Sequence, residues 1–578
     1  MKLLKITIIF AFATINIMGC STSYVPVETF AEAEDPIALT LEQETEWGGV
    51  TEPINGAWAS ADLRYSRSTV PHLTDVKTLP LVAWRGERVS AQLLLWTAEG
   101  ADGVRCEVAE FRSEGAMLPA TIAQTRFVRY TLSDTTFRAS DTPILSADML
   151  DTLSRFDIAP RSVRPVWLTI SVPQDAQEGV YTSEVVVSYN GRGRVVLPLT
   201  LEVQRYSLPT PDKWSYHLDL WQHPTAVARA EGVELWSEAH FEALRRDMTQ
   251  LANAGQKVIT ATLNKDPWNH QCYDGYEPMI GWTLRRDGTW CYDYAIFDRW
   301  VEMMLDLGID KMINCYSMVP WNCELDYYDE AKGEVVTVVA EPGTQVFVDM
   351  WRPFLIDFKG HLAERGWLSI TNIAMDERAP EAMDAAVSLL AECAPEMGFA
   401  IADMHHSYRR YLNMRDVCVA QEQPADSTDI HVRREQGYTT TFYICCNPQF
   451  PNTFSYSHPY EAELLGWYGL ACDYDGMLRW AYNSWPAEPH YDSRYGNWGS
   501  ADTFLIYPFA RSSIRFERLI DGIEIAEKVR TLRRLGVDTG SVDEVLRRLL
   551  EADINNPHEP WEQILTEARA ALDAVSRR

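Results

Sequence analysis

The chain has 578 residues, 46% of them apolar, and a formal net charge of −30 at pH 7. One hydrophobic core rarely serves so many residues, so the sequence predicts two or three domains. A strongly acidic surface repels phosphate backbones, which argues against nucleic acid as a partner and favours an uncharged substrate. The 20 Trp and 26 Tyr residues are typical of proteins that handle sugars, although many will lie in the cores of a large protein.

The first 20 residues have the pattern of a bacterial export signal. Lys2 and Lys5 form a basic start, Ile6 to Met18 is apolar, and Ile17 to Cys20 resembles a lipobox. We therefore expect a lipidated Cys20 to tether the mature protein to the outer membrane, with a simple cleaved signal peptide as the alternative. The residues after Cys20 lack the acidic run associated with surface export, which favours the periplasmic face. No later segment reaches the ~20 apolar residues that a membrane span needs.

Residues 21–46 are polar, acidic and interrupted by proline, as expected of a linker. Residues 47–207 then contain short segments in which apolar and polar residues alternate, such as Val166–Val172 and Ser183–Tyr189. Alternation of this kind, with many β-branched residues, predicts an antiparallel β-sandwich domain. Leu208 to Pro211 is typical of a hinge before the next domain.

From residue 212 the pattern changes, because apolar strand-like runs now alternate with helical stretches. Between the first two runs, Ser237 can begin a helix and Gly255 can end it. Eight such runs predict a (β/α)8 TIM barrel over residues 212–515, followed by a helical C-terminal extension over 516–578. The expected strands are Trp214–Leu220, Lys257–Leu263, Lys311–Ser317, Trp367–Met375, Phe399–Met404, Thr439–Cys446, Leu478–Asn483 and Thr503–Tyr507.

Ten cysteines follow Cys20, and none has the close spacing of a zinc site. Most are expected to be small core residues, and Cys445 and Cys446 are neighbours on an expected strand. In an exported protein a disulfide between Cys272 and Cys291 is an alternative, although the spacing alone does not assign it.

Asp376 and Glu377 follow the apolar run that ends at Met375. Two carboxylates held side by side do not both ionise freely, so the pKa of one is raised. The pair then supplies a proton donor and a carboxylate at the mouth of the expected barrel, which is what acid/base catalysis requires. The alternative is structural, with Asp376 as the N-cap of a helix and Glu377 in its first turn.

Active sites of TIM barrels lie at the carboxyl ends of the strands. Polar and aromatic side chains at the expected ends therefore predict a carbohydrate pocket, although each aromatic side chain could equally belong to the core. The chain has no His-x-His on its first barrel strand and no His-Glu-x-x-His, Gly-rich phosphate or Gly-x-Ser-x-Gly motif, so neither metal nor cofactor is expected. The expected substrate-binding residues are Trp321, His405, Tyr443, Asn447, Trp480, Tyr482, Trp485 and Asp502.

Seven motifs spread along the chain carry a family resemblance. They are Val166–Pro173, Glu178–Tyr181, Met375–Glu377, Tyr443–Pro448, Leu478–Trp485, Asp502–Pro508 and Ser513–Arg518. Together, over about residues 80–535, they resemble glycoside hydrolase family 123, whose founding activity is exo-β-N-acetylgalactosaminidase. Two positions depart from the family pattern, because Ala501 and Phe509 stand where relatives tend to have Gly.

The resemblance implies substrate-assisted hydrolysis, in which the 2-acetamido oxygen of the sugar attacks the anomeric carbon. Asp376 would accept a hydrogen bond from the acetamido N–H and stabilise the oxazolinium-like intermediate. Glu377 would protonate the leaving oxygen and then deprotonate water. A retaining enzyme with its own nucleophile needs two carboxylates about 5 Å apart across the anomeric carbon, which adjacent residues do not easily provide.

The leading hypothesis is an exported, retaining exo-β-N-acetylhexosaminidase that removes terminal β-linked N-acetylgalactosamine from a glycan or glycoconjugate. One alternative is a barrel glycosidase for a different sugar, in which Glu377 works with a distant carboxylate such as Asp502. Another is a non-catalytic carbohydrate-binding surface lipoprotein built on a barrel that has lost its activity. Loss of catalysis usually removes the acids first, and this chain keeps both Asp376 and Glu377. The sequence specifies neither the linkage, nor the aglycone, nor the oligomeric state.

Overall fold

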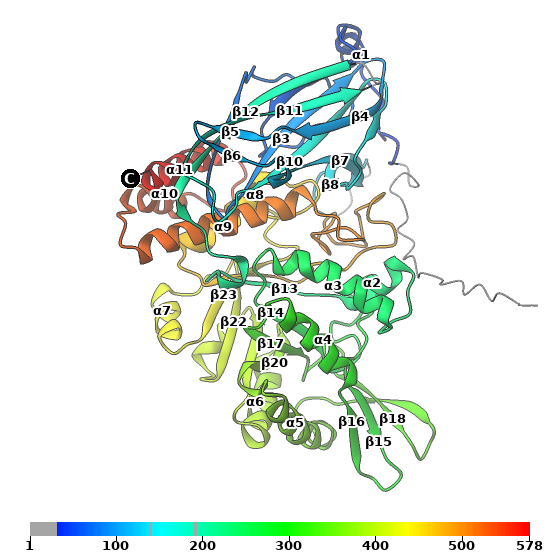
Figure 1. The fold of residues 1–578 in the computed structure, drawn as a ribbon. Helices are drawn as coiled ribbons and strands as arrows, with labels where there is room; N and C mark the ends of the chain where they lie inside the picture. Colours follow the sequence, from blue (N-terminus) through cyan, green and yellow to red (C-terminus); the bar gives the residue numbers. More distant parts are fainter. Residues whose placement is uncertain (1–31, 138–141, 190–192, 578) are drawn as a thin grey trace, which may run out of the picture. The chain divides into compact units, whose positions relative to one another are not determined.

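The computed structural model describes residues 32–137, 142–189 and 193–577 (Figure 1). The expected export signal, including Cys20, lies outside the described residues. The described part contains an antiparallel β-sandwich, a nearly closed barrel of eight parallel strands with helices, and a helical C-terminal end. The predicted fold class is therefore confirmed. No helix in these three ranges combines the length and the apolar character needed to cross a membrane.

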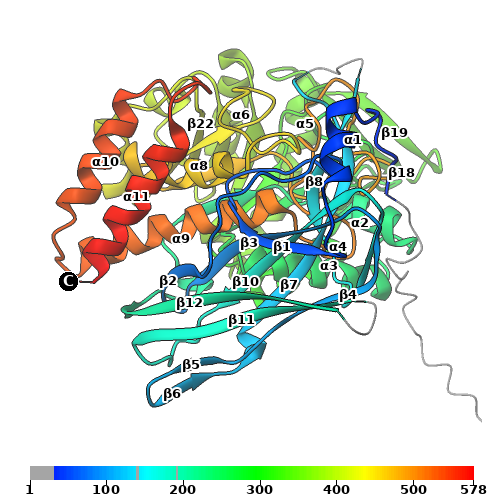
Figure 2. The ribbon, with the colours of Figure 1, turned by 90° about the horizontal axis from the view of Figure 1, so that it is seen from above.

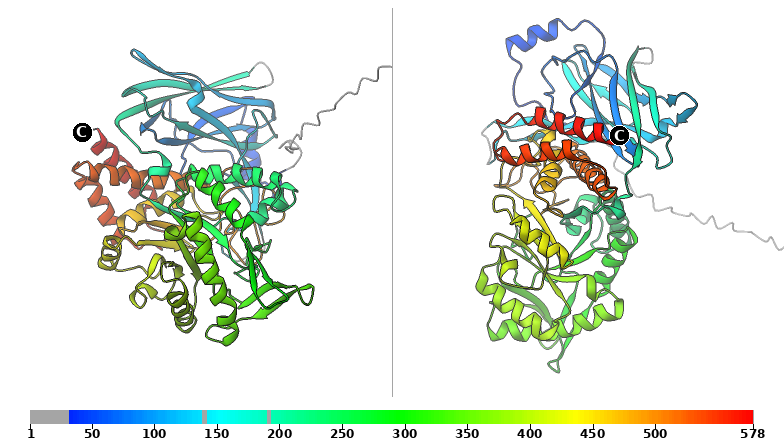
Figure 3. Two further views of the ribbon diagram at one scale, coloured as in Figure 1. Left: turned by 60° about the horizontal axis from the view of Figure 1, so that its bottom comes forward. Right: turned by 90° about the vertical axis from the view of Figure 1, so that its left-hand side faces the viewer.

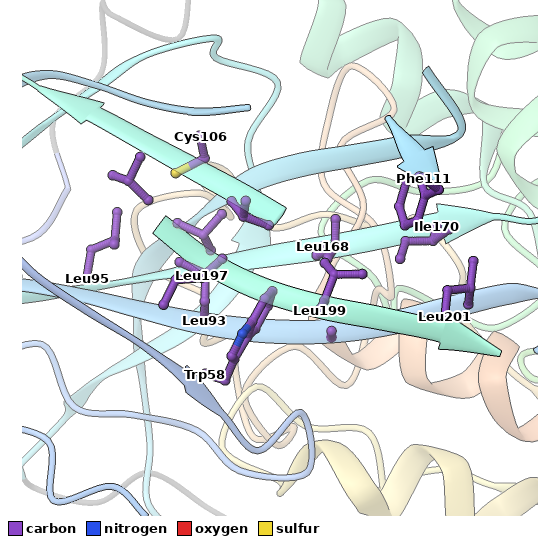
Figure 4. Packing of buried hydrophobic residues seen from close by; sticks show 14 of the residues in the cluster. Trp58, Leu93, Leu95, Cys106, Phe111, Leu168, Ile170, Leu197, Leu199 and Leu201 are labelled. Atoms are coloured by element: carbon purple, nitrogen blue, oxygen red, sulfur yellow. The ribbon is translucent and has the colours of Figure 1, made fainter. Parts of the chain in front are cut away.

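Two sheets form the sandwich, with strand orders β1-β3-β10-β7-β8 and β2-β12-β11-β4-β9, and β5 and β6 form a small hairpin beside β11. Leu197, Leu199 and Leu201 of β12 enter the core together with Trp58 of β1 (Figure 4). This spacing of two residues is the alternation that predicts the sheet. The strands are β1 Asn55–Ala59, β2 Leu79–Arg85, β3 Arg88–Thr97, β4 Ala101–Val108, β5 Phe111–Ser113, β6 Ala116–Leu118, β7 Ala123–Ser133, β8 Ile144–Leu150, β9 Phe156–Ile158, β10 Ser162–Ser171, β11 Gly179–Tyr189 and β12 Gly193–Ser207.

Residues 32–46, which their composition assigns to a linker, pack on the sandwich instead. The Glu32 carboxylate accepts hydrogen bonds of 2.5 and 2.7 Å from the guanidinium of Arg164 on β10. Helix α1 (Leu41–Gly48) begins with Thr40 as its N-cap, and Trp47 near its end is buried. Composition does not reveal this attachment, because it depends on individual contacts such as the charge-assisted pair of Glu32 with Arg164 and the burial of Trp47.

The barrel strands follow the order β13-β24-β23-β22-β21-β20-β17-β14, and the hydrogen-bonded neighbours run parallel. Figure 3 shows strands and helices together in this green and yellow part of the chain. The strands are β13 His217–Leu220, β14 Val258–Thr262, β17 Met312–Tyr316, β20 Thr371–Asp376, β21 Gly398–Asp403, β22 Met414–Ala420, β23 Thr439–Ile444 and β24 Gly476–Arg479. The helices of this region are α2 Pro224–Glu231, α3 Glu238–Ala252, α4 Ala295–Asp306, α5 Gln345–Arg365, α6 Pro380–Cys393, α7 Ser427–Glu435 and α8 Pro459–Ala471.

Side-chain amides join the two end strands of this sheet, β13 and β14. Between them Leu218 and Gln256 form an isolated bridge. The side-chain oxygen of Gln256 accepts a 3.0 Å hydrogen bond from the N–H of Leu220, and that of Gln222 accepts a 2.8 Å bond from the N–H of Thr260. Buried backbone donors need partners, so the two glutamines complete the barrel where the strand ladder is short.

One expected strand is wrong, and one true strand is not evident from the sequence. Residues 503–507 form no strand; Phe504 makes only an isolated bridge, and its carbonyl accepts a 2.8 Å hydrogen bond from Arg515. The place in the barrel belongs to β22, whose polar Asp416 accepts a 2.9 Å hydrogen bond from Asn314 of β17. The apolar run at 503–507 therefore indicates burial but not strand pairing. In β22 the buried, polar Asp416 interrupts the apolar pattern by which a strand is predicted.

A four-stranded sheet, not expected from the sequence, is inserted after β14 and β17 (Figure 1). Its strand order is β16-β15-β18-β19. Trp282 of β15 is buried and stacks on Phe354 of α5, with ring centroids 4.4 Å apart. The strands are β15 Gly281–Leu284, β16 Trp290–Asp293, β18 Glu324–Asp329 and β19 Glu334–Val339.

Helix α9 (Ile514–Arg534) lies beside the sandwich strands β3 and β10 (Figure 2). Its Glu517 accepts a 3.1 Å hydrogen bond from Arg126 on β7 and pairs also with Arg88 on β3. Although burial opposes the effect, these arginines lower the pKa of Glu517 to about 2. The helix is therefore fixed to the sandwich by a buried, charged contact. Helices α10 (Gly540–Glu551) and α11 (Trp561–Ser576) complete the C-terminal end.

The ten cysteines among the described residues are free thiols. The disulfide considered between Cys272 and Cys291 is therefore not formed in this structure. Cys272 is buried, and burial raises the pKa of its thiol to about 12.

Candidate active site

Asp376 is the last residue of β20, and Glu377 begins the loop after it. The backbone of Glu377 is left-handed, with φ of +48°, and its N–H donates a 2.9 Å hydrogen bond to the carbonyl of Ala402 on β21. Non-glycine residues rarely adopt positive φ, and backbone strain of this kind is common at functional sites. The following helix, α6, has Ala379 as its N-cap, so the structural alternative for Asp376 does not hold.

Tyr443 holds Glu377 from across the barrel mouth. The Tyr443 hydroxyl donates a 2.6 Å hydrogen bond to Oε1 of Glu377. Tyr443 belongs to β23, and two strands separate it from β20. Burial raises the pKa of Tyr443, and the hydrogen bond to Glu377 raises it further, so the phenol stays protonated and remains a donor.

The Asp376 carboxyl is half-buried beside Glu377. Burial and the negative charge of Glu377 raise the pKa of Asp376 to about 8, against the opposing effects of Arg378 and of the indole N–H groups of Trp321 and Trp268. Near neutral pH the ligand-free pair therefore holds a proton, as expected of two adjacent acids. The raised member of the pair is Asp376.

Arg378 is a site residue that the residue types at the strand ends did not reveal. Its Nε donates a 3.2 Å hydrogen bond to the carbonyl of Asp376, and its guanidinium lies 5.7 Å from the centroid of the Trp321 ring. Its positive charge lowers the pKa of Asp376 and so limits the effect of Glu377. In the sequence, only the position of Arg378 directly after two acids indicates that its positive charge could act on them.

Aromatic side chains surround the same end of the barrel. The ring centroid of Trp268 lies 4.9 Å from that of Trp221 and 5.0 Å from that of Tyr316. Short alanine side chains of β20, β21 and β22 belong to the same apolar cluster. Flat rings beside carboxyl groups suit a sugar, which has both an apolar face and hydroxyl groups. Three partly buried side chains pack against this cluster, namely Trp321, Trp480 and Cys445.

Asp502 supports Trp480 from a buried position. The indole N–H of Trp480 donates a 3.2 Å hydrogen bond to Asp502, which also accepts a 2.9 Å bond from Arg479. Asp502 and Arg479 are both fully buried in this structure, and contact between Asp502 and a substrate stays a prediction. Trp480 continues outward to Trp498, whose ring centroid is 5.2 Å away. Trp498 lies in a loop without a strand, which explains why no periodic pattern indicated it.

Tyr482 and Trp485 lie in the core of this structure, and their contact with a substrate stays a prediction. The Tyr482 hydroxyl donates a 3.0 Å hydrogen bond to the carbonyl of Asp247 on α3. The Trp485 indole donates a 2.6 Å bond to the carbonyl of Ile506. Both side chains are fully buried. Because β24 already ends at Arg479, Tyr482 and Trp485 lie in the segment after the strand and not at its end.

Asn447 and His405 lie on exposed loops after β23 and β21. The Asn447 side chain donates a 2.7 Å hydrogen bond to Glu422, which follows β22. The sequence pattern does not predict β22, so the predicted strand ends do not include Glu422. The N–H of His405 donates a 2.8 Å hydrogen bond to Asp403, while its ring remains exposed.

A cavity of about 520 Å³ lies where the sandwich meets α3 and α9, away from these residues. Its lining includes Arg88, Arg126 and Arg246. These arginines already pair with Glu517 and Glu231, so their charge is matched within the protein. The acid pair Asp376 and Glu377 at the barrel mouth is therefore a better candidate for the active site than this cavity.

The family follows from a direct comparison with sequence models. The model "Glycoside hydrolase 123, catalytic domain" matches residues 221–532, more than half of the chain. The chain belongs to glycoside hydrolase family 123. The model "Glycoside hydrolase 123 N-terminal domain" matches residues 58–189, within the β-sandwich. The family 123 resemblance of the seven motifs is thereby confirmed, and the protein is a glycoside hydrolase.

One solved structure supports the same family. A family 123 glycoside hydrolase from Clostridium perfringens, described in terms of glycolipid glycan hydrolysis, is 26% identical and superposes with a TM-score of 0.83, covering 90% of this chain and 98% of that one. A Bacteroides ovatus GH5 xyloglucanase is 10% identical, with a TM-score of 0.28 over 81% of this chain and 100% of that one, which is too low to support an argument. A search of curated proteins finds no match.

Proposed function

We propose that this family 123 enzyme is a retaining exo-β-N-acetylhexosaminidase that removes terminal β-linked N-acetylgalactosamine with the help of the substrate's own 2-acetamido group. The observation that carries the proposal is the adjacency of Asp376 and Glu377 at one strand end, with Glu377 held by Tyr443. Adjacent acids can serve the acetamido group and the leaving oxygen of one sugar. A nucleophile of the enzyme would have to approach the anomeric carbon from the opposite side to the acid.

Two other acids of the barrel are poorly suited to act as that nucleophile. Asp502 is fully buried and paired with Arg479. Asp219, on β13, is also buried, and burial followed by the charge of Asp416 raises the pKa of Asp219 well above its usual range. A protonated carboxyl is a weak nucleophile. The alternative mechanism, in which Glu377 works with a distant carboxylate such as Asp502, is therefore disfavoured.

In the proposed mechanism the proton of the acid pair moves when substrate binds. The amide N–H of the sugar donates to Asp376 and favours its charged form, so the proton becomes available on Glu377. Glu377 gives this proton to the glycosidic oxygen while the acetamido oxygen attacks the anomeric carbon and the bond to the aglycone breaks. Water then opens the cyclic intermediate, and Glu377 takes its proton. Tyr443 keeps the Glu377 carboxyl oriented in both steps.

Glycolipid glycans are the substrate class that we propose. The Clostridium perfringens enzyme is described in terms of glycolipid glycan hydrolysis, and its similarity extends over 90% of this chain. Trp480 and Trp498 continue the aromatic surface outward from the apolar cluster at the barrel mouth. Such rings offer a stacking surface to a second sugar of the glycan.

We also propose that the enzyme is exported and held at the periplasmic face of the outer membrane by a lipid on Cys20. The support is the sequence pattern of the first 20 residues. In a Gram-negative host, labelled palmitate should enter the wild-type protein and the outer-membrane fraction, but not a Cys20→Ala variant. An unlabelled wild-type protein in the soluble fraction would contradict the anchor.

The enzymatic proposal is tested with aryl β-glycosides of N-acetylgalactosamine, N-acetylglucosamine, galactose and glucose. We expect cleavage of the N-acetylgalactosaminide, and a loss of about 10²- to 10⁴-fold in the Glu377→Gln variant with a poor leaving group. Circular dichroism of the variant checks that its fold is intact. Cleavage of the galactoside or glucoside would contradict substrate assistance, cleavage of the N-acetylglucosaminide alone would contradict the sugar, and no cleavage at all would contradict both.

A further inference from the structure

Cys445 and Cys446 bring two thiols together at the edge of the active site. In an extended strand, consecutive side chains point to opposite faces of the sheet. Strand β23 ends at Ile444, however, and the chain bends at the two cysteines. Their Sγ atoms lie 3.9 Å apart. The bend is held by Asn447, whose carbonyl accepts a 3.2 Å hydrogen bond from the N–H of Cys445 and a 3.5 Å bond from its thiol.

The two thiols are chemically unequal. The Cys445 thiol donates to the carbonyl of Asn447 and packs against the aromatic cluster, whereas Cys446 makes neither of these contacts among the described residues. The contact between the two sulfurs and burial raise the pKa of Cys445, and the same contact lowers the pKa of Cys446. Cys446 is therefore the better nucleophile, because the thiolate is the reactive form. Both side chains are half-buried, so a small reagent can approach them.

The other cysteines of the described residues lack this arrangement. Six of them are buried, and burial raises their pKa values. Cys291 and Cys472 are half-buried like the pair, but neither adjoins another cysteine in the chain. These two serve as matched controls for exposure without a neighbouring thiol.

We propose that Cys445 and Cys446 are a reversible redox-modification site that closes to a vicinal disulfide when it meets a disulfide oxidant. The Cys446 thiolate attacks one sulfur of the oxidant and expels the other sulfur as a thiolate, which leaves a mixed disulfide on Cys446. Cys445 then loses its proton, attacks the Cys446 sulfur and releases the second half of the oxidant as a thiol. Two protein thiols are oxidised, and one external disulfide is reduced to two thiols.

Covalent geometry makes this bond easy to reverse. Adjacent Cα atoms are about 3.8 Å apart, whereas ordinary disulfides join Cα atoms about 4.4–6.8 Å apart. A bond between neighbouring cysteines is therefore strained, and strained disulfides are reduced more readily than structural ones. The pair is suited to respond to the redox state of the surroundings and not to stabilise the fold.

The position of the pair couples it to the site. Cys445 packs against the aromatic cluster as one of its partly buried members. Tyr443, two residues earlier, donates the hydrogen bond to Glu377, and Asn447, two residues later, donates to Glu422. Closure draws the two sulfurs from 3.9 Å to about 2.05 Å and removes the thiol that donates to Asn447. The edge of the site formed by this loop must then change shape.

The test uses the purified mature chain, first reduced and then incubated with glutathione disulfide. Remaining thiols are alkylated under denaturing conditions, and peptides are sequenced by mass spectrometry. We expect residues 445 and 446 to lose two hydrogens together, to escape alkylation, and to recover both thiols after dithiothreitol. Cys291 and Cys472 should remain alkylated or carry glutathione. A wild-type protein in which both neighbouring cysteines are alkylated, or in which glutathione remains on Cys446, would overturn the proposal.

Single variants separate the two steps. Cys445→Ser should stop at a stable glutathione adduct on Cys446, whereas Cys446→Ser should form an adduct more slowly. Equal rates of adduct formation in the two variants would overturn the assigned order of attack. If a variant does not fold, the wild-type mass measurement still decides whether the disulfide forms.

The coupling to the site rests on the proposed function and has its own readout. With an aryl N-acetylgalactosaminide, closure should change KM at least about twofold in the wild-type enzyme, and dithiothreitol should restore the original KM. The same treatment should leave KM unchanged in a variant that carries both Cys445→Ser and Cys446→Ser, because it can form neither the disulfide nor a glutathione adduct on this loop. An unchanged KM in the closed enzyme would overturn the coupling. Failure of the glycosidase proposal would appear as missing activity in the reduced enzyme, while the mass measurement would be unaffected.

Discussion

The hydroxyl of Tyr443 and the carboxylate of Glu377 meet at 2.6 Å across the mouth of the barrel, although their strands are separated by two others. This contact ties the acid of the proposed mechanism to the opposite wall. Glu377 itself has a left-handed backbone, so its side chain depends on such support for its orientation.

Replacing Tyr443 by Phe should lower kcat about 10- to 100-fold, because a hydrogen bond to a charged group contributes about 1.5–3 kcal/mol. The matched control is Tyr482→Phe, which removes a buried hydroxyl bonded to a backbone carbonyl of α3. That variant should keep kcat and lose about 1 kcal/mol of stability. Steady-state kinetics and thermal unfolding of both variants provide the comparison. Equal kcat values for Tyr443→Phe and the wild type would exclude a role for the contact.

Asp376→Asn should change how stability depends on pH. Between the ordinary pKa of an aspartate, about 3.9, and its native value of about 8, the native state holds a proton that the unfolded state has released. The native state therefore binds more protons, and the contribution of Asp376 to the free energy of unfolding falls as pH rises through this window. Asparagine removes that contribution.

The measurement is denaturant unfolding of the wild type and Asp376→Asn at pH 5 and pH 8. We expect the variant to gain stability relative to the wild type as the pH increases. The same variant should hydrolyse acetamido sugars more slowly whatever the leaving group, because it loses the negative charge beside the cyclic intermediate. A constant stability difference across this pH range would contradict the raised pKa.

Asp502→Asn should act through the fold and the position of Trp480. It leaves Arg479 buried without its charged partner, a change that typically costs about 3–5 kcal/mol. Azide can replace a missing carboxylate nucleophile in retaining glycosidases, so it distinguishes the two roles. We expect azide to restore no activity to Asp502→Asn and to yield no glycosyl azide. Rescue by azide would restore the distant-carboxylate mechanism.

Ala501 and Phe509 keep a glycine-like backbone without glycine. Their φ values are +59° and +65°, a region that Gly enters freely and other residues enter at a cost of about 1–2 kcal/mol. The positions at which the chain departs from the family pattern therefore keep a left-handed backbone. Relative to the family pattern, these two positions therefore differ in carrying a side chain and in the backbone strain that the side chain causes.

Ala501→Gly should consequently change stability by less than about 0.5 kcal/mol, because relief of strain offsets the lost methyl group and the added chain entropy. The control is Ala526→Gly, equally buried but inside α9, which should cost about 1–2 kcal/mol. Thermal unfolding of both variants tests the difference. Equal losses would show that Ala501 carries no backbone strain.

The sequence by itself determined the order of the domains and the position of the acid pair. Alternation over Leu197, Leu199 and Leu201 indicates a sheet with one buried face, and that face lies in the sandwich core. The apolar run before Asp376 indicates a buried strand, and its polar end marks the barrel mouth. Both features are local, because periodicity and strand ends are properties of one segment.

Only the tertiary structure decided which residues meet. Tyr482 and Trp485 have the residue types of a sugar-binding site but lie in the core. Arg378 and Trp498 contact the residues of the candidate site, and no strand-end pattern predicts them. The polar Asp416 breaks the apolar pattern of β22, so the sequence does not predict this strand. Its carboxylate can be buried because it accepts a hydrogen bond from Asn314, which lies far away in the chain. Hydrophobic pattern reports how buried a segment is, but not which partners bury it. The contact of Tyr443 with Glu377 spans two intervening strands, so it exists only once the barrel has closed.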